Sequence, residues 1–265
     1  MKIVSLLTDF GLRDGYVGVM KGVIWHIAPE VQIADISHNI SPQNIMEGAI
    51  AWGRTVPYFP DGAVHVGVID PGVGTQRRPI AARIGSQYFV MPDNGLISWV
   101  LEEAEATDQT VTFVQLDNPK YWLAEISSVF HGRDIFSPVG AHLANGVSLE
   151  DLGDPIDDPV RLHIASPQRS PTSVSGEVIS IDYFGNLASN IKRSDLVELG
   201  AITVHICGEE IDGLVRTFGE RPPGELIALY GTRDDLLVSV VNGNAAQRLN
   251  AKVGQKIEVF PKQED

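Results

Sequence analysis

Short apolar runs alternate with segments of helical character in the N-terminal part of the chain. The apolar runs, each of which predicts a buried β-strand, cover residues 2–8, 31–37, 63–70 and 87–92. Helices are predicted between and after them, over residues 14–29, 43–59, 96–104 and 130–146. Strands that alternate with helices favour parallel pairing through helical crossovers. The pattern therefore predicts an α/β sandwich-like domain with a mostly parallel sheet.

The pattern changes after residue 150. Residues 151–173 are rich in proline and serine, which favours a domain linker near residues 165–173. Beyond it, apolar and polar residues alternate at period two between Gly and Asn turns, as in short strands of a small β-barrel. We therefore expect an α/β domain at 1–167 and an all-β barrel domain at 174–265.

Composition narrows the class of protein. A formal net charge of −14 over 265 residues makes nucleic acid an unsuitable partner, because phosphate binding depends on clustered Lys and Arg. The one cysteine, Cys207, rules out an intramolecular disulfide and fits a reducing compartment. The apolar stretch Ile3–Leu7 is too short for a signal-peptide core or a membrane span. A cytoplasmic protein is the prediction.

Polar residues follow the predicted strands. Asp9, Asp70 and Asp93 each come at a strand end, and His131 stands just before a helix. In open α/β sheets, ligands bind beyond the carboxyl ends of the strands. If the strands are neighbours, these groups meet at one rim of the sheet.

The loop DPGVGTQRR, residues 70–78, is rich in glycine but does not fit a phosphate loop. A dinucleotide or ATP fingerprint must lead into a helix, whereas Pro79 and an apolar run follow here. What remains is Asp70 near Arg77 and Arg78. Such a pair either orients a water for attack or is a salt bridge that fixes the turn, and the residues alone leave both readings open.

The other candidates also have two readings. His131 is either a general base or a hydrogen-bonded structural residue. Asp9 either accepts ribose hydroxyls or belongs to a turn. Asp182 and Asn186 interrupt a strand as a turn does, although an Asn amide also suits the edge of adenine. Residues 242–246 first suggest a hairpin turn.

Six separated motifs together point to one family. TDFG, DPGVGTQRR, PDNG, FHGRD, IDYFGN and NGNAAQRL, in this order, resemble the S-adenosylmethionine hydroxide adenosyltransferases over almost the whole chain. These are adenosine-forming S-adenosylmethionine hydrolases related to fluorinases and chlorinases. The resemblance implies an N-terminal α/β domain, a C-terminal β-barrel and a homotrimer that binds its ligand between subunits.

The resemblance also implies roles for individual residues. Asp70, Arg77 and His131 match the family's water-activating set, and motif spacing favours Arg77 over Arg78. The substrate-binding positions are matched by Asp9 for the ribose, Asp182 and Thr232 for the methionine end, and Asn186 and Ala245 for adenine. Residues 232–235, TRDD, depart from the family's usual Ser-aromatic-Gly-aromatic stretch, and Ala188 stands where fluorinases have tryptophan.

Three positions favour water over halide as the nucleophile. The halide-using relatives carry tyrosine at the positions of Asp70 and His131, and fluorinases carry serine at that of Gly132. A carboxylate repels an anion, whereas water donates to it.

The sequence therefore predicts hydrolysis of S-adenosylmethionine to adenosine and L-methionine, by attack of an activated water on ribose C5′. In that hypothesis Asp70 and His131 hold and deprotonate the water, and Arg77 stabilises the developing hydroxide. No metal or cofactor is expected. The alternatives are a 5′-halogenase, a non-catalytic S-adenosylmethionine or adenosine sensor, and a metal-dependent phosphohydrolase built on Asp9, Asp70, Asp93, His131 and Asp134.

Overall fold

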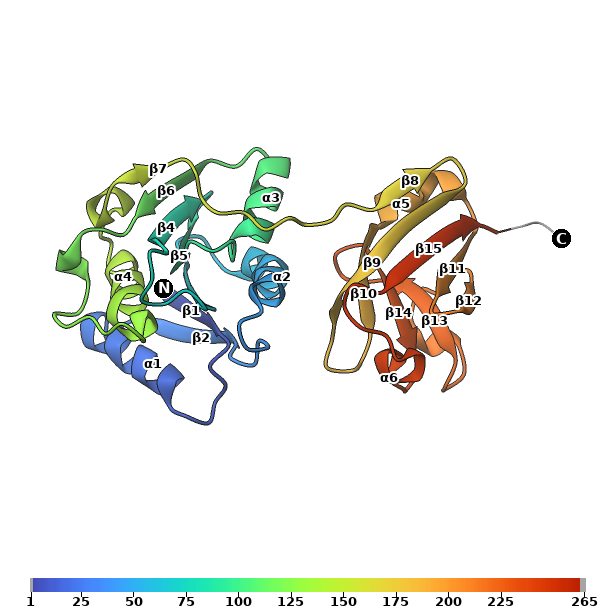
Figure 1. Ribbon diagram of the computed structural model, residues 1–265, viewed down its shortest axis with the longest axis horizontal. Helices are drawn as coiled ribbons and strands as arrows, with labels where there is room; N and C mark the ends of the chain where they lie inside the picture. The colour runs from blue at the N-terminus through green and yellow to red at the C-terminus, as the bar shows by residue number, and fades with distance from the viewer. Residues whose placement is uncertain (1, 263–265) are drawn as a thin grey trace. The chain divides into compact units, whose positions relative to one another are not determined.

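The computed structural model describes residues 2–262 and divides into two compact units, one on each side of the His163–Ile164 bond (Figure 1). Unit 1 is α/β and unit 2 is almost entirely β, which confirms the predicted fold class. The short strand β8 (Gln168–Ser170) pairs with the next strand of unit 2. The sequence predicted a linker at residues 165–173, but residues 168–170 of this stretch form a strand. Pairing with the neighbouring strand orders the segment although it is rich in Pro and Ser.

Unit 1 contains a seven-stranded sheet in the order β2-β1-β3-β5-β4-β6-β7. β1, β2, β3 and β5 run parallel, and β4 enters antiparallel beside β5. The strands are β1 (Ile3–Thr8), β2 (Gln32–Ser37), β3 (Val64–Val68), β4 (Pro79–Ile84), β5 (Gln87–Pro92), β6 (Val111–Gln115) and β7 (Pro155–Ile156).

Helices cover both faces of this sheet. α1 packs with α4 over one apolar core, and α2 packs with α3 over the other. The helices are α1 (Tyr16–Ile27), α2 (Ile45–Thr55), α3 (Ser98–Ala106) and α4 (Ser137–Ala144), with a π-helix at Gly132–Phe136 directly before α4 and 3₁₀ turns at Val56–Tyr58, Pro119–Tyr121 and Leu149–Leu152. Because both faces are covered, every residue of the central strand β3 is buried.

Unit 2 is a nearly closed antiparallel sheet in the order β12-β11-β15-β9-β10-β14-β13 around its own apolar core. Its remaining strands are β9 (Ser173–Ile181), β10 (Leu187–Lys192), β11 (Ile202–Ile206), β12 (Glu209–Asp212), β13 (Leu226–Tyr230), β14 (Asp235–Val240) and β15 (Lys256–Pro261). Its helical segments are α5 (Arg193–Leu196), α6 (Ala245–Leu249) and 3₁₀ turns at Val197–Leu199 and Phe218–Glu220.

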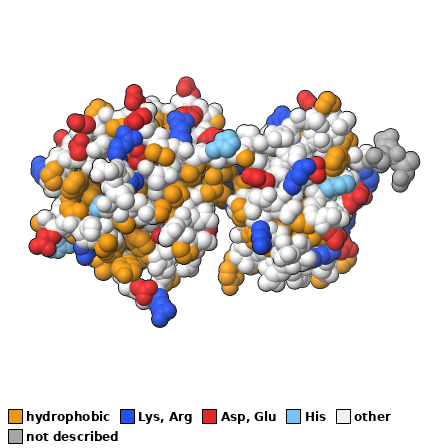
Figure 2. All heavy atoms as spheres, viewed as in Figure 1, with side chains coloured by type: hydrophobic (Ala, Val, Ile, Leu, Met, Phe, Trp, Pro, Cys, Tyr) orange, Lys and Arg blue, Asp and Glu red, His pale blue; other side chains and the backbone are white. Residues whose placement is uncertain are grey.

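The surface mixes charges of both signs. On the face shown in Figure 2, acidic and basic side chains are interspersed and form no basic patch. Within residues 2–262, each helix is too short or too polar to cross a membrane.

Candidate active site

One edge of the unit 1 sheet gathers the polar residues that follow its strands. β1, β3 and β5 are adjacent and parallel, so Asp9, Asp70 and Asp93 follow strand ends at the same edge. β4 runs the other way and begins at this edge, which brings Arg77 and Arg78 there. The polar residues that follow these strands therefore lie at one edge of the sheet, as the sequence predicts.

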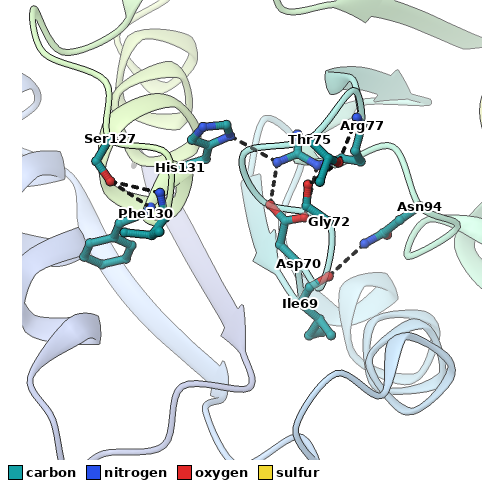
Figure 3. Close-up of polar contacts among 10 residues, drawn as sticks. Ile69, Asp70, Gly72, Thr75, Arg77, Asn94, Ser127, Phe130 and His131 are labelled. Atoms are coloured by element: carbon teal, nitrogen blue, oxygen red, sulfur yellow. Dashed lines mark hydrogen bonds and ion pairs between the residues drawn. The ribbon is translucent and has the colours of Figure 1, made fainter.

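Arg77 lies between Asp70 and His131 and contacts both (Figure 3). Its Nε donates to Asp70 Oδ1 at 3.0 Å, and its Nη2 donates to Asp70 Oδ2 at 2.5 Å. The same Nη2 is 3.1 Å from Nδ1 of His131. The side chains of Asp70 and Arg77 are only 5% and 7% exposed, so salt screens their interaction little. The three residues expected to act together form one cluster, in which the side chains of Asp70 and Arg77 are buried and His131 is partly buried.

The bond to Arg77 determines the state of His131. A guanidinium has donors and no acceptor, so His131 accepts this bond through an unprotonated Nδ1. The neutral ring then carries its proton on Nε2. Burial lowers the pKa of His131 and the charge of Arg77 lowers it further, against opposing effects of Asp70 and Asp134. These effects favour the neutral ring at pH 7.

The carboxylate of Asp70 is more basic than that of an exposed aspartate. Burial raises its pKa, and the charge and hydrogen bonds of Arg77 only partly oppose this. Arg77 alone would lower this pKa, but desolvation has the larger effect. A raised pKa makes the carboxylate a better acceptor for a proton from water.

Arg77 has one guanidinium nitrogen without a protein partner. Nη1 is buried and donates to no hydrogen-bond acceptor among residues 2–262. Leaving a buried charged donor unpaired is unfavourable, so a small oxygen ligand at this nitrogen would stabilise the cluster. The guanidinium also lies 5.4 Å from the centre of the Phe136 ring, which limits how it can turn.

Gly74 allows the loop that carries Asp70 and Arg77 to approach the loop that carries His131. Its φ is +74°, and a Cβ placed on it would lie 2.2 Å from the backbone oxygen of Ser128. Only glycine fits this conformation and this contact without strain. Thr75 completes the turn, because its hydroxyl donates to the Gly72 carbonyl and accepts from Arg77 N.

Replacing Gly74 by alanine should therefore destabilise the protein and displace the loop. Gly15 is the matched control, since its φ is also +74° but nothing lies within 4 Å of its Cβ position. We expect Gly74→Ala to lower the free energy of unfolding, measured in urea, by about 1–3 kcal/mol more than Gly15→Ala. Equal losses in the two variants would show that the contact with Ser128 has no energetic role.

The loop before His131 is folded by a buried carboxylate. Asp134, whose side chain is fully buried, accepts from Ser127 N at 2.8 Å and from Arg133 Nε. The Ser127 hydroxyl in turn accepts from the backbone N of Val129 and Phe130. Arg133 and Asp134 thus shape the turn that presents His131 rather than facing Asp70.

Asp9, the expected ribose ligand, lies in the turn after β1. One of its carboxylate oxygens accepts from the backbone N of Gln43 at 2.7 Å. Gln43 has a φ of +65°, so the carboxylate supports an unusual backbone conformation in the loop before α2. The proposed contact with ribose stays a prediction.

Three of the four predicted substrate-binding residues of unit 2 lie at one end of its sheet. Asp182, in the β9–β10 turn, accepts from Phe184 N and Asn186 N at 2.9 Å and from Asn186 Nδ2 at 2.7 Å. Ala245 begins α6, which is joined to the same turn by the bond from Ala246 N to the carbonyl oxygen of Gly185.

Thr232, the fourth of these residues, lies elsewhere in unit 2. It is in the turn between β13 and β14, beside Arg193, whose N donates to the Asp234 carbonyl. The β10–β14 register pairs Lys192 with Asp235, so this turn lies at the far end of β10 from Asn186. At about 3.3 Å per residue the separation along the strand is roughly 20 Å. Thr232 stands in the TRDD stretch where the chain departs from the family pattern, and its role stays a prediction.

Comparison with known proteins identifies the family. The model of the SAM hydroxide adenosyltransferase N-terminal domain matches residues 4–153, and that of the C-terminal domain matches residues 176–258. This chain belongs to the SAM hydroxide adenosyltransferase family. The resemblance inferred from the six sequence motifs is confirmed.

Relatives of this chain include proteins named (R)-S-adenosyl-L-methionine hydrolase. That of Salinispora arenicola is 36% identical over 97% of both chains, and that of Thermus thermophilus is 37% identical over 98% of this chain and all of the relative. A fluorinase of an Actinoplanes species is 31% identical over 75% of this chain and 74% of its own. A solved structure of an uncharacterized conserved protein from Thermotoga maritima has a TM-score of 0.90 at 34% identity, covering 97% of this chain and 99% of its own.

The carboxylates and histidines of the chain were also considered as ligands of a metal ion. Across the described part of the chain, no three His, Cys, Asp or Glu side chains are arranged to hold a metal ion. Three of the four carboxylates considered for such a cluster pair with cations instead, Asp70 with Arg77, Asp93 with Arg78 and Asp134 with Arg133. That the reaction needs no metal stays a prediction.

Sequence reasoning missed the residues that support the cluster. Thr75, Ser127 and Asn94 all bond backbone groups next to the candidate catalytic residues. Thr75 and Asn94 stand in motifs that were recognised, but a Thr or Asn in a turn has no pattern that distinguishes such a role.

Proposed function

We propose that this chain hydrolyses S-adenosylmethionine to adenosine and L-methionine. The observation that carries the proposal is the cluster of Asp70, Arg77 and His131, in which Arg77 Nη1 has no partner in residues 2–262. Family membership and the names of the relatives support it. From those names we also propose that the preferred substrate has the R configuration at sulfur.

The reaction is a single displacement at ribose C5′. The oxygen of water attacks C5′, and the C5′–S bond breaks with its electron pair going to sulfur. Because the sulfonium becomes a neutral thioether, no acid is needed for the leaving group. The proton lost by water is the only one that the protein must accept.

The three residues then have different tasks. Asp70 takes the proton from water, since its carboxylate is buried and its pKa is raised. Arg77 Nη1 donates to the oxygen as negative charge develops there. His131 holds the guanidinium through Nδ1. This departs from the sequence hypothesis, in which His131 helped to deprotonate the water. The Nδ1 lone pair is used by Arg77 and Nε2 carries the ring proton, so the neutral ring has no free site for another proton.

The remaining assignments follow the family resemblance. We propose that Asp9 binds ribose, that Asp182 binds the methionine end, and that Asn186 and Ala245 bind adenine, without a metal or cofactor. Because Thr232 lies at the other end of β10, we propose that it reaches the methionine end of a substrate held by a different subunit. We also propose a homotrimer, which sedimentation measures directly. A cytoplasmic location fits Cys207, an exposed free thiol.

Product analysis tests the proposal. The protein is incubated with the separated R and S epimers of S-adenosylmethionine in H₂¹⁸O, and products are identified by chromatography and mass spectrometry. We expect adenosine with ¹⁸O at the 5′ position, formed faster from the R epimer. A 5′-halo product in halide buffer without adenosine would replace hydrolase by halogenase, and binding without turnover would leave a sensor. EDTA inhibition reversed by Mg²⁺ or Mn²⁺ would show that a metal takes part.

We expect kcat/KM to decrease at acid pH. Activity requires Asp70 ionised and His131 neutral, and both conditions are lost as the pH falls. Because the pKa of His131 lies below its usual 6.5, protonation of this ring should reduce activity only below about pH 6.5. The measurement is kcat/KM from pH 4.5 to 9, with the titration of His131 followed by NMR. A His131 that titrates above 6.5 would contradict the neutral ring described here.

A further inference from the structure

Asn94 holds the residue directly before Asp70. Its Nδ2 donates to the carbonyl oxygen of Ile69 at 2.8 Å (Figure 3), and its Oδ1 accepts from Leu96 N at 3.3 Å. The second bond fixes the amide orientation. The backbone at the start of the loop is therefore tied to the end of β5.

Asp93 holds the residue directly after Arg77. Its Oδ2 accepts from Nε and Nη2 of Arg78 at 2.9 and 2.6 Å, and its backbone N donates to the Arg78 carbonyl at 2.9 Å. The Asp93 side chain is only 2% exposed. Its other oxygen accepts from Val160 N at 2.7 Å, so the carboxylate is used on both sides.

We propose that Asp93 and Asn94 are positioning residues that brace the Asp70–Arg77 ion pair by gripping Ile69 and Arg78, the two residues that flank its loop. The inference rests on the proposed function, because it assigns the PDNG motif a part in the same reaction.

The contacts of Asp93 and Asn94 limit the movement of a loop that is otherwise flexible. The loop between the two attachment points contains Gly72 and Gly74, which place few limits on their own dihedral angles. The ion pair joins the first and last residues of that loop, and displacing either by about 1 Å is enough to cost on the order of 10²-fold in rate. Two adjacent residues on a rigid strand end fix both attachment points at once.

Two variants, each with a matched control, test the proposal. Asn94→Ala removes the bond to Ile69. Its control is Asn118→Ala, because Asn118 makes the same two bonds, from Nδ2 to the Asp151 carbonyl at 2.8 Å and to Oδ1 from Lys120 N at 3.2 Å. Asp93→Asn weakens the fork with Arg78. Its control is Glu105→Gln, which weakens the two-bond fork of Glu105 with Arg161.

Steady-state kinetics with S-adenosylmethionine give the first readout. We expect kcat to fall about tenfold or more in Asn94→Ala and Asp93→Asn, with KM changed less than about threefold. The double variant should lose less than the product of the two single losses, since both act on one ion pair. The two controls should match the wild-type kcat, and thermal melts show whether every variant is folded.

Titration of His131 gives a second readout that needs no turnover. The charged groups that face His131 are Arg77, Asp70 and Asp134. With ¹³C-labelled histidine, the His131 signal is assigned as the one of seven that His131→Asn removes. When Asp93→Asn loosens Arg77, the pKa of His131 should rise, whereas Glu105→Gln should leave it unchanged.

The outcomes separate the two proposals. If the wild-type protein forms no adenosine, the proposed function fails, and the His131 titration still decides whether the brace exists. If the wild-type protein turns over but both brace variants keep its kcat, KM and His131 titration, the brace proposal is overturned. Equal loss of kcat in each variant and its control also overturns it, since any disrupted network would then suffice.

Discussion

Asp70→Asn should lower the kcat for S-adenosylmethionine about 10²- to 10⁴-fold, which is the usual contribution of a general base. The amide keeps the shape of the side chain and remains beside Arg77, but it cannot accept a proton from water. Binding should change by no more than a few-fold, because the substitution removes no proposed contact with the substrate. Kinetics and calorimetric titration of the ligand measure the two effects separately.

Glu105→Gln is the control for this substitution. Glu105 and Arg161 form the same kind of two-point ion pair as Asp70 and Arg77, but they are about half exposed, 49% and 53%. We expect little change in kcat or stability, as is usual for exposed pairs. If Asp70→Asn instead weakened binding and left kcat intact, Asp70 would be a substrate ligand rather than the base.

The course of the chain through unit 1 was largely predictable from local pattern. β3 is buried on both faces and is apolar apart from His65, whereas α2 places Ala49 and Trp52 on the face turned to the sheet. The strand-end rule then gave the edge at which Asp70 and Arg77 meet. These features are local or follow from general topology, so one sequence suffices to find them.

Arg77 and Arg78 pair with different carboxylates, and the strand that follows them determines which arginine pairs with which. Successive side chains of an extended segment point in opposite directions, so one arginine faces Asp70 while the next faces Asp93. Which one faces which carboxylate depends on how β4 pairs with β5. Motif spacing favoured Arg77, but the residue pattern alone gave no physical reason for that choice.

Unit 2 shows where sequence reasoning stops. Asp182 and Asn186, which are predicted to bind different ends of the substrate, have side chains that bond each other in one turn. Thr232 is predicted to bind the same end of the substrate as Asp182, and the register of β10 and β14 puts it at the far end of β10. These roles stay predictions. Register is set by the packing of the whole sheet, so motif order along the chain does not reveal it.

The raised pKa of Asp70 could not be predicted from the sequence either. An arginine seven residues away predicts a lowered pKa, while burial raises it. Burial is a property of the assembled loop, which depends on the close contact of Gly74 with Ser128.

Arg77→Met should lower kcat at pH 7 about 10²- to 10³-fold or more, because it removes the donor proposed for the developing hydroxide. It also removes the cation that opposes the effect of burial on Asp70. The pKa of Asp70 should then rise further, since a buried carboxylate without a partner favours its protonated form.

The expected rise in the pKa of Asp70 gives Arg77→Met a second measurable effect besides the loss of kcat. With a higher pKa, Asp70 is ionised only at higher pH, so the acid limb of kcat/KM should move upward relative to the wild-type protein. Arg77→Lys keeps the charge but not the two-point fork or the bond to His131, so its limb should move less while kcat still falls. Arg161→Met removes the matching exposed fork and should leave both kcat and the limb unchanged. A large loss of kcat in Arg77→Met with an unmoved limb would mean that the arginine acts on the nucleophile alone and does not hold Asp70 in its charged form.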